Sequence, residues 1–204
     1  MFEEILSVQN LLFALVSGYL LGSIPFASVA ARMRGVDIFT TGSTMAGAAN
    51  VFWHIGHRTG ALVLAGDVAK GSAAVIAAGL LDLSPSVLLL AGGAAILGHW
   101  KSAFSGFKGG DGMATLIGVT IALEPLLSVL GILVGLMAAL VLWRAPLRSA
   151  WCLFAGFTAM LVVGQYYQID RELVVGIVAL ALLVLFHSLV AKWRRWHLRS
   201  KFSG

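Results

Sequence analysis

The sequence predicts an all-α integral membrane protein with about seven transmembrane helices, some of them short or broken. Apolar residues make up 59% of the 204 positions and charged residues only 11%, whereas soluble domains carry about 25% charged residues. The mean hydropathy of +0.94 points the same way. Composition therefore excludes an ordinary soluble domain. The chain shows no linker or low-complexity tract, which predicts a single membrane domain over residues 1–204.

Seven apolar runs define the expected helices. A full crossing needs about 20 residues, so the third and fourth runs are expected to be half-helices beside a polar cavity or re-entrant segments. Pro125 separates the fourth run from the fifth, because proline lacks the N–H that continues a helix. In chain order the runs are about Leu11–Ala31, Gly60–Leu81, Ser86–Gly98, Met113–Leu123, Leu126–Trp143, Ala150–Gly164 and Leu173–Ala191.

Charge placement orients these helices. If the runs alternate sides, every Lys and Arg except Arg171 and Lys70 falls on one side of the membrane. The positive-inside rule then predicts an amino terminus outside and a carboxyl terminus in the cytoplasm. The net charge of +5 is thus a topology signal. No basic patch with stacking aromatics on a soluble face indicates nucleic-acid binding.

Two glycine-rich segments on the predicted cytoplasmic side are the candidate anion-binding loops. The first is GSTMAGAAN, Gly42–Asn50, and the second is FKGGDGMAT, Phe107–Thr115. Glycine lets backbone N–H groups approach a ligand closely, and successive N–H groups form an anion-binding nest. The first segment alone fits tight helix packing equally well. The second is the stronger signal, because Lys108 and its glycines precede an apolar run whose N-terminus favours anions.

Few ionisable residues lie within the apolar runs or at their ends. Asp67 and Lys70 are one helical turn apart, so they are expected to pair, either as a structural ion pair or beside a substrate. His99 and His187 lie near the predicted cytoplasmic ends of their runs, and histidine titrates near neutral pH. Cys152 is the only cysteine. No metal-ligand spacing occurs, so neither a metal nor another cofactor is expected.

Several short segments in this order resemble the bacterial PlsY family of acyl-phosphate:glycerol-3-phosphate acyltransferases. The resemblance covers nearly the whole chain and includes both glycine-rich segments. The segments that carry it are GSIPFA (Gly22–Ala27), RGVDI (Arg34–Ile38), GSTMAGAAN, ALVLAGDVAKG (Ala61–Gly71), LGH (Leu97–His99) and FKGGDGMAT.

This resemblance implies a bacterial inner-membrane enzyme of phospholipid synthesis with its active side in the cytoplasm. Family members move a fatty acyl group from acyl phosphate to a hydroxyl of glycerol 3-phosphate, giving lysophosphatidate and phosphate. They require no coenzyme A, acyl carrier protein or metal, so the implied partners are the two substrates and the bilayer. The implied catalytic residues are His99, His187 and Ser149, and the implied substrate-binding residues are Ser43, Gly47, Asn50, Lys108, Gly109, Gly110 and Gly112.

The chain departs from the family pattern at a few positions. Trp53 stands where the family has an arginine, Asp111 replaces a lysine of the second loop, and Val190 replaces an asparagine. The loss of two cations disfavours a dianionic phosphate. One alternative is therefore a divergent paralogue with an altered substrate, or with a lipid-binding or regulatory role. A channel or transporter is disfavoured, because the polar residues gather at one side and not at the bilayer midplane.

Overall fold

The computed structural model describes residues 2–145 and 148–202, apart from the side chains of residues 2–6, 148–150 and 195–202. This described part is helical and contains no strand. Its elements are α1 (Phe2–Gly22), α2 (Phe26–Arg32), α3 (Ala48–His54), α4 (His57–Gly79), α5 (Pro85–Trp100), the 3₁₀ turn η1 (Ala103–Ser105), α6 (Met113–Leu123), α7 (Pro125–Val141), α8 (Arg148–Tyr166) and α9 (Arg171–Phe202).

The first apolar run is broken, although the sequence predicted one helix over Leu11–Ala31. The chain leaves the helix after Gly22 and re-enters it at Phe26, with Pro25 just before the second helix. Proline provides no N–H for the helical ladder. Ser23 closes α1 by donating its N–H to the Tyr19 carbonyl at 2.9 Å. The break therefore begins at a residue that is fully buried.

Small residues let the central helices α1, α4, α5 and α6 pack closely. A Cβ added at Gly71 of α4 would collide with the Thr115 carbonyl of α6. A Cβ at Gly118 of α6 would likewise collide with the Val68 carbonyl of α4. Such close backbone approach is a main source of helix association in membranes. These contacts fix α6 against α4.

The helix lengths fit the predicted membrane class. Within the described residues, four stretches are long and apolar enough to cross a bilayer: Ser7–Arg32, His57–Gly79, Pro85–Ser105 and Arg171–Arg194. Helix α6 has 11 residues, about 16 Å at 1.5 Å per residue, against a hydrocarbon core about 30 Å thick. The all-α class and the short fourth run are confirmed. The third run was also expected to be a half-helix or re-entrant segment, but Pro85–Ser105 is long and apolar enough to cross. The number of crossings and the sides of the termini remain predictions.

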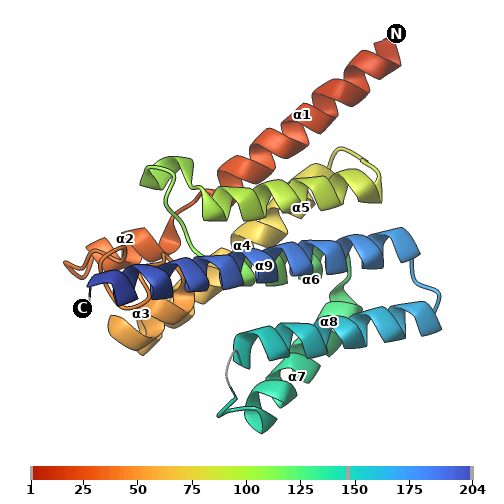
Figure 1. Cartoon of the computed structure of the whole chain (residues 1–204). Coiled ribbons are helices and arrows are strands. Elements are labelled where there is room, and N and C mark those ends of the chain that lie inside the picture. Colours follow the sequence, from red (N-terminus) through yellow and green to blue (C-terminus); the bar gives the residue numbers. More distant parts are fainter. Residues whose placement is uncertain (1, 146–147, 203–204) are drawn as a thin grey trace.

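Figure 1 shows that the two ends of the molecule differ. Helices α2 and α3 lie at the same end as the C-terminus, and the N-terminus lies at the opposite end. Helices α7 and α8 pack on each other, α7 also touches α6, and α8 also touches α9. Helix α9 extends as far as Phe202, so it includes the basic segment Lys192–Lys201.

Candidate active site

The first glycine-rich segment is folded around the side chain of Asn50. Its Nδ2 donates to the carbonyls of Thr41 at 3.0 Å and Met45 at 2.9 Å. Its Oδ1 accepts the Ser43 N–H at 3.1 Å. Asn50 is 4% exposed, so these bonds form away from water. Asn50 thus holds the shape of the loop, while Ser43 remains exposed at its surface.

The second glycine-rich segment packs against both the first segment and the end of α5. The Gly109 carbonyl accepts the Ala46 N–H at 3.1 Å, and Gly110 donates its N–H to the His99 carbonyl at 3.2 Å. A Cβ at Gly110 would collide with the Ala46 carbonyl and with Nε2 of His99. Two segments far apart in the sequence therefore meet at one place, called here the loop junction and defined by the Ala46–Gly109 bond.

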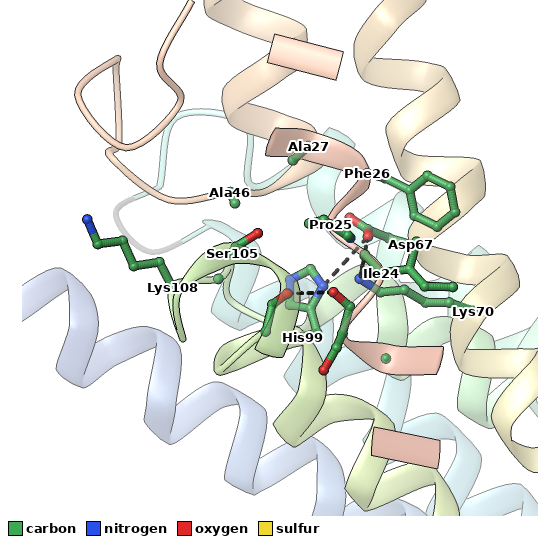
Figure 2. Close-up of a pocket in the computed structure, with 14 residues that line it drawn as sticks. Ile24, Pro25, Phe26, Ala27, Ala46, Asp67, Lys70, His99, Ser105 and Lys108 are labelled. Carbon is green, nitrogen blue, oxygen red and sulfur yellow. Dashed lines mark hydrogen bonds and ion pairs between the residues drawn. The ribbon is translucent and has the colours of Figure 1, made fainter. Parts of the chain in front are cut away.

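His99 lies against the loop junction and is 5% exposed. Its Nδ1 is 3.6 Å from Oδ1 of Asp67, and Nζ of Lys70 is 2.8 Å from that same oxygen. The predicted Asp67–Lys70 pair is thus confirmed. Figure 2 shows the His99 ring beside Asp67 in a cavity of about 10 Å³, which is close to the space of one water molecule.

Asp111 supports the start of α6. Its Oδ1 accepts the Met113 N–H at 3.2 Å, which satisfies one of the amides left open at a helix N-terminus. Its carbonyl accepts the Nε1–H of Trp100 at 2.8 Å. The Trp100 ring stacks on His187 with centroids 4.1 Å apart. Asp111 therefore has a structural role that lysine would not fill, and Trp100 connects the second loop with His187.

Lys108 lies at the outer side of the site. It is exposed, and its Nζ lies 5.5 Å from the ring centroid of Phe39. Figure 2 shows it extending away from His99 and Asp67. It also borders an open cavity of about 620 Å³ that Arg32 and Asp37 line as well. This cavity presents two cations and one acid to solvent beside the loop junction.

The remaining predicted residues differ in how the structure places them. Gly112 has a φ of 88° and lies against Nε1 of Trp100, so a side chain there is both strained and blocked. Gly47 precedes α3, and a Cβ there would meet no atom within 4 Å. Ser149 is helical, but its side chain lies outside the described residues. Trp53 is 68% exposed and outside the loop junction.

Two contacts at the site were missed by sequence reasoning. Asp67 approaches His99 across α4 and α5, and Trp100 stacks on His187 across α5 and α9. Each contact joins separate helices, so spacing along the chain does not indicate it. A partial signal existed for Asp67, because an acid within an apolar run faces a partner or a cavity as a rule.

An apolar cavity of about 330 Å³ lies between α6, α7 and α8. It begins at Met113, the residue that follows Gly112 of the second loop. Small or aliphatic residues such as Ile132 and Gly135 form much of its wall. Cavities of this size hold small ligands or apolar groups. The site thus combines clustered amides, a cation, a buried imidazole and an apolar cavity.

Within the described residues, no group of three or more His, Cys, Asp or Glu side chains is arranged to hold a metal ion.

Comparison with known proteins gives one consistent result. The family model described as glycerol-3-phosphate acyltransferase matches residues 12–196. A glycerol-3-phosphate acyltransferase of Roseiflexus sp. is 38% identical, covering 91% of this chain and 80% of its own. One of Aquifex aeolicus is 37% identical, covering 86% of this chain and 91% of its own. A crystal structure of PlsY, an integral membrane glycerol 3-phosphate acyltransferase in its glycerol 3-phosphate form, superimposes with a TM-score of 0.76, 33% identity and 93% coverage of both chains.

Proposed function

The chain belongs to the glycerol-3-phosphate acyltransferase family, and on this premise we propose that it moves a fatty acyl group from acyl phosphate to a hydroxyl of glycerol 3-phosphate. It is a membrane acyltransferase of lipid biosynthesis. The acyl donor, the site residues and the side of the membrane are the proposal. The observation that carries it is the loop junction, where two glycine-rich segments meet against His99.

The loop junction suits a reaction in which both substrates carry a phosphate. Glycine amides and the N-terminus of α6 provide partial positive charge. Lys108 and Arg32 add full charges at the neighbouring open cavity. Cations at the mouth of a cleft raise the local concentration of a soluble anion. We therefore assign both phosphates to the loop junction, with glycerol 3-phosphate on the side that opens toward Lys108 and Arg32.

The proposed step uses an already activated acyl group. The hydroxyl oxygen of glycerol 3-phosphate forms a bond to the acyl carbon, and the bond from that carbon to the phosphate oxygen breaks. The hydroxyl proton passes to a base and then to the departing phosphate, so the products are lysophosphatidate and phosphate. Holding the two reactants in line supplies much of the rate. His99 is the base that we propose.

His187 and Ser149 complete the proposed catalytic group. Trp100 holds the His187 ring by stacking and is itself bonded to the carbonyl of Asp111. This arrangement supports a role for His187 at the edge of the second loop. Ser149 is retained from the family resemblance alone. Ser43, Gly47 and Asn50 on the first loop and Gly109, Gly110 and Gly112 on the second are the proposed substrate-binding set, with Lys108.

The fatty acyl chain requires an apolar site within reach of the phosphate. The cavity between α6, α7 and α8 begins at Met113, next to the second loop. We assign the acyl chain of the donor to this cavity. Glycine at position 135 leaves room there, and Ile132 on the same helix α7 narrows the wall. The same cavity would hold the chain of the product, and a related PlsY is known in a lysophosphatidic acid form.

The membrane orientation follows from charge. The end that carries α2, α3 and the C-terminus is also where the basic residues gather in the sequence. By the positive-inside rule we place this end in the cytoplasm of a bacterial cell, at the inner membrane. A soluble substrate would then reach the loop junction from the cytosol. The divergent-paralogue alternative is not favoured, because the relatives are named as acyltransferases over most of the chain.

The test is product formation by the purified protein reconstituted in lipid. Acyl phosphate and glycerol 3-phosphate should yield lysophosphatidate, with one phosphate released per product. The control is Lys108→Ala, with its fold checked by thermal unfolding. No product above the rate of that control would overturn the proposal. Product from acyl coenzyme A but not from acyl phosphate would overturn the donor and leave the acceptor.

A further inference from the structure

The buried pair of α4 makes more contacts than helix packing requires. Lys70 donates from Nζ to the Ile24 carbonyl at 3.0 Å, which leaves that carbonyl satisfied at the break between α1 and α2. The same Nζ lies 2.8 Å from Oδ1 of Asp67. Both side chains are at most 3% exposed. A pair that served only architecture would be complete with these contacts.

His99 is the additional partner. Its Nδ1 lies 3.6 Å from the same Oδ1 of Asp67, which is longer than a hydrogen bond but close enough for a strong electrostatic contact. The opposite ring nitrogen, Nε2, faces Gly110 at the loop junction. Within the described residues, this Nε2 is buried without a hydrogen-bond partner. One nitrogen thus faces a carboxylate and the other faces the proposed site.

Among the described residues that line the small cavity, the charged groups around His99 come from α4 and the second loop. Asp67 and Lys70 face it from α4, and Lys108 lines the same small cavity from the second loop. The break between α1 and α2 lines that cavity with the uncharged residues 22–27. The carboxylate of Asp67 is therefore the group that favours a proton on Nδ1. A proton on Nδ1 leaves the lone pair of the neutral ring on Nε2.

We propose that Asp67 is a positioning residue for His99, and that Lys70 holds Asp67 in place. This inference rests on the proposed acyl transfer. Asp67 orients the ring and keeps its proton on Nδ1, so that Nε2 accepts the proton of the attacking hydroxyl of glycerol 3-phosphate. The imidazolium then returns a proton to the phosphate that leaves the acyl carbon. A carboxylate that orients a histidine base in this way serves the same purpose in hydrolases.

The small cavity fits this role. Its volume of about 10 Å³ is close to that of one water molecule, which is also the size of a single hydroxyl group. A larger part of the substrate would have to lie outside, on the side of Lys108 and the open cavity. Figure 2 shows His99 and Lys108 on different sides of this space.

The activity test compares Asp67→Asn with Lys70→Met. Asp67→Asn should lower kcat about 100-fold or more and change the KM for glycerol 3-phosphate by less than about threefold. Without the carboxylate that orients it, His99 loses its function as the general base, which contributes about 10²- to 10⁴-fold. The acidic limb of its kcat–pH profile should move to lower pH, since the lost carboxylate no longer stabilises imidazolium. Lys70→Met keeps the carboxylate beside His99 but removes its ion-pair partner, so it should lower the unfolding temperature and lower kcat less than Asp67→Asn does. A folded Asp67→Asn with kcat within about threefold of wild type and an unmoved pH profile would overturn the proposal.

A second measurement tests the positioning role without depending on activity, in case a single variant folds poorly or the proposed substrates are wrong. Nitrogen-15 NMR of histidine-labelled protein reports which ring nitrogen of His99 carries the proton, without any substrate. Wild type should show the proton on Nδ1, and the double variant Asp67→Asn/Lys70→Met, which leaves no lone buried charge, should lose that preference. If wild type makes no lysophosphatidate, the proposed function fails. The NMR measurement of the protonated nitrogen of His99 still decides whether Asp67 positions the ring. A His99 proton on Nε2 in wild type would overturn it.

Discussion

The polar region where the middle of α4 meets the end of α5, and the apolar pair α7 and α8, are held in place by different forces. In the polar region, Asp67 and Lys70 from the middle of α4 and His99 near the end of α5 are all buried. An ion pair of 2.8 Å joins Asp67 to Lys70, and Nδ1 of His99 lies 3.6 Å from the same carboxylate oxygen. In the described part of α7 and α8, Ser128 is the only polar residue among the buried ones. There the two helices meet through glycines, with Gly156 against the Gly131 carbonyl.

This difference separates two tasks. Buried polar groups have strict partners, so a small displacement leaves a charge or a donor unsatisfied and costs much. Apolar walls tolerate changes of shape and respond mainly to volume. We therefore expect substitutions in the polar region to abolish the reaction. Substitutions along α7 should instead change which acyl chain reacts.

Among the proposed substitutions, Gly110→Ala should cause the largest loss of acyl-transfer rate. The added Cβ would collide with the Ala46 carbonyl and with Nε2 of His99, so the two loops must separate. Misplacement of reacting groups by about 1 Å can cost about 100-fold in rate. We expect at least that loss in the acyl-transfer assay. The control is Gly79→Ala at the end of α4, where a Cβ meets nothing within 4 Å. Equal rates for both variants would contradict the loop junction.

The substitution Ile132→Trp, in the apolar pair of helices, should change the preference for acyl-chain length and leave the acyl-transfer reaction itself intact. Ile132 lines the apolar cavity, and a larger ring should shorten the space for the acyl chain. Loss of one methylene site is worth about 1–3 kcal/mol, so kcat/KM for long acyl phosphates should fall about tenfold relative to short ones. The matched control is Leu133→Trp, one residue along and 56% exposed. If both variants keep the wild-type preference, the chain does not lie in this cavity.

The substitution Asp111→Ala should have a moderate effect on stability. It removes the side-chain acceptor of the Met113 N–H, and loss of such a helix cap costs about 1 kcal/mol. The unfolding temperature in detergent should fall, and Asp111→Asn, whose side chain also carries an acceptor, should restore it. An Asp111→Lys variant that is as stable as wild type would show that the cap is unimportant.

The smallest effect concerns the end of the molecule away from the loop junction. Burial, together with the neighbouring charge of Asp170, raises the pKa of Glu124. A carboxyl whose pKa is raised by folding adds stability while it is protonated, and that stability is lost as pH rises through the raised pKa. Glu124→Gln should therefore unfold at a slightly higher temperature than wild type at neutral pH and show no gain at acidic pH. A gain at acidic pH alone would contradict the direction.

The sequence predicted most of the fold because apolar length and proline placement act locally. The run Met113–Leu123 became α6 with the same bounds, and Pro125 begins α7. The break at Pro25 was missed, because the apolar pattern continues through it. The short helix α3 was also missed, since its seven residues carry no clear periodic face.

The site was predictable in its loops but not in its cross-helix contacts. Glycines and family motifs indicated both segments that form the loop junction. The pairing of Asp67 with Lys70 followed from their spacing within one helix. The approach of Asp67 to His99 depends on how α4 packs against α5, and a single sequence does not carry that packing. The capping role of Asp111 likewise required the position of the Met113 amide.

Binding of glycerol 3-phosphate, measured by isothermal titration on the purified protein, tests the loop junction most directly. Wild type and Gly79→Ala should bind with the same affinity, and Gly110→Ala and Lys108→Ala should bind at least about tenfold more weakly, a difference of about 1.4 kcal/mol. Wild-type affinity in a folded Gly110→Ala protein would contradict the account, because the joined loops would then not be the site of the phosphate.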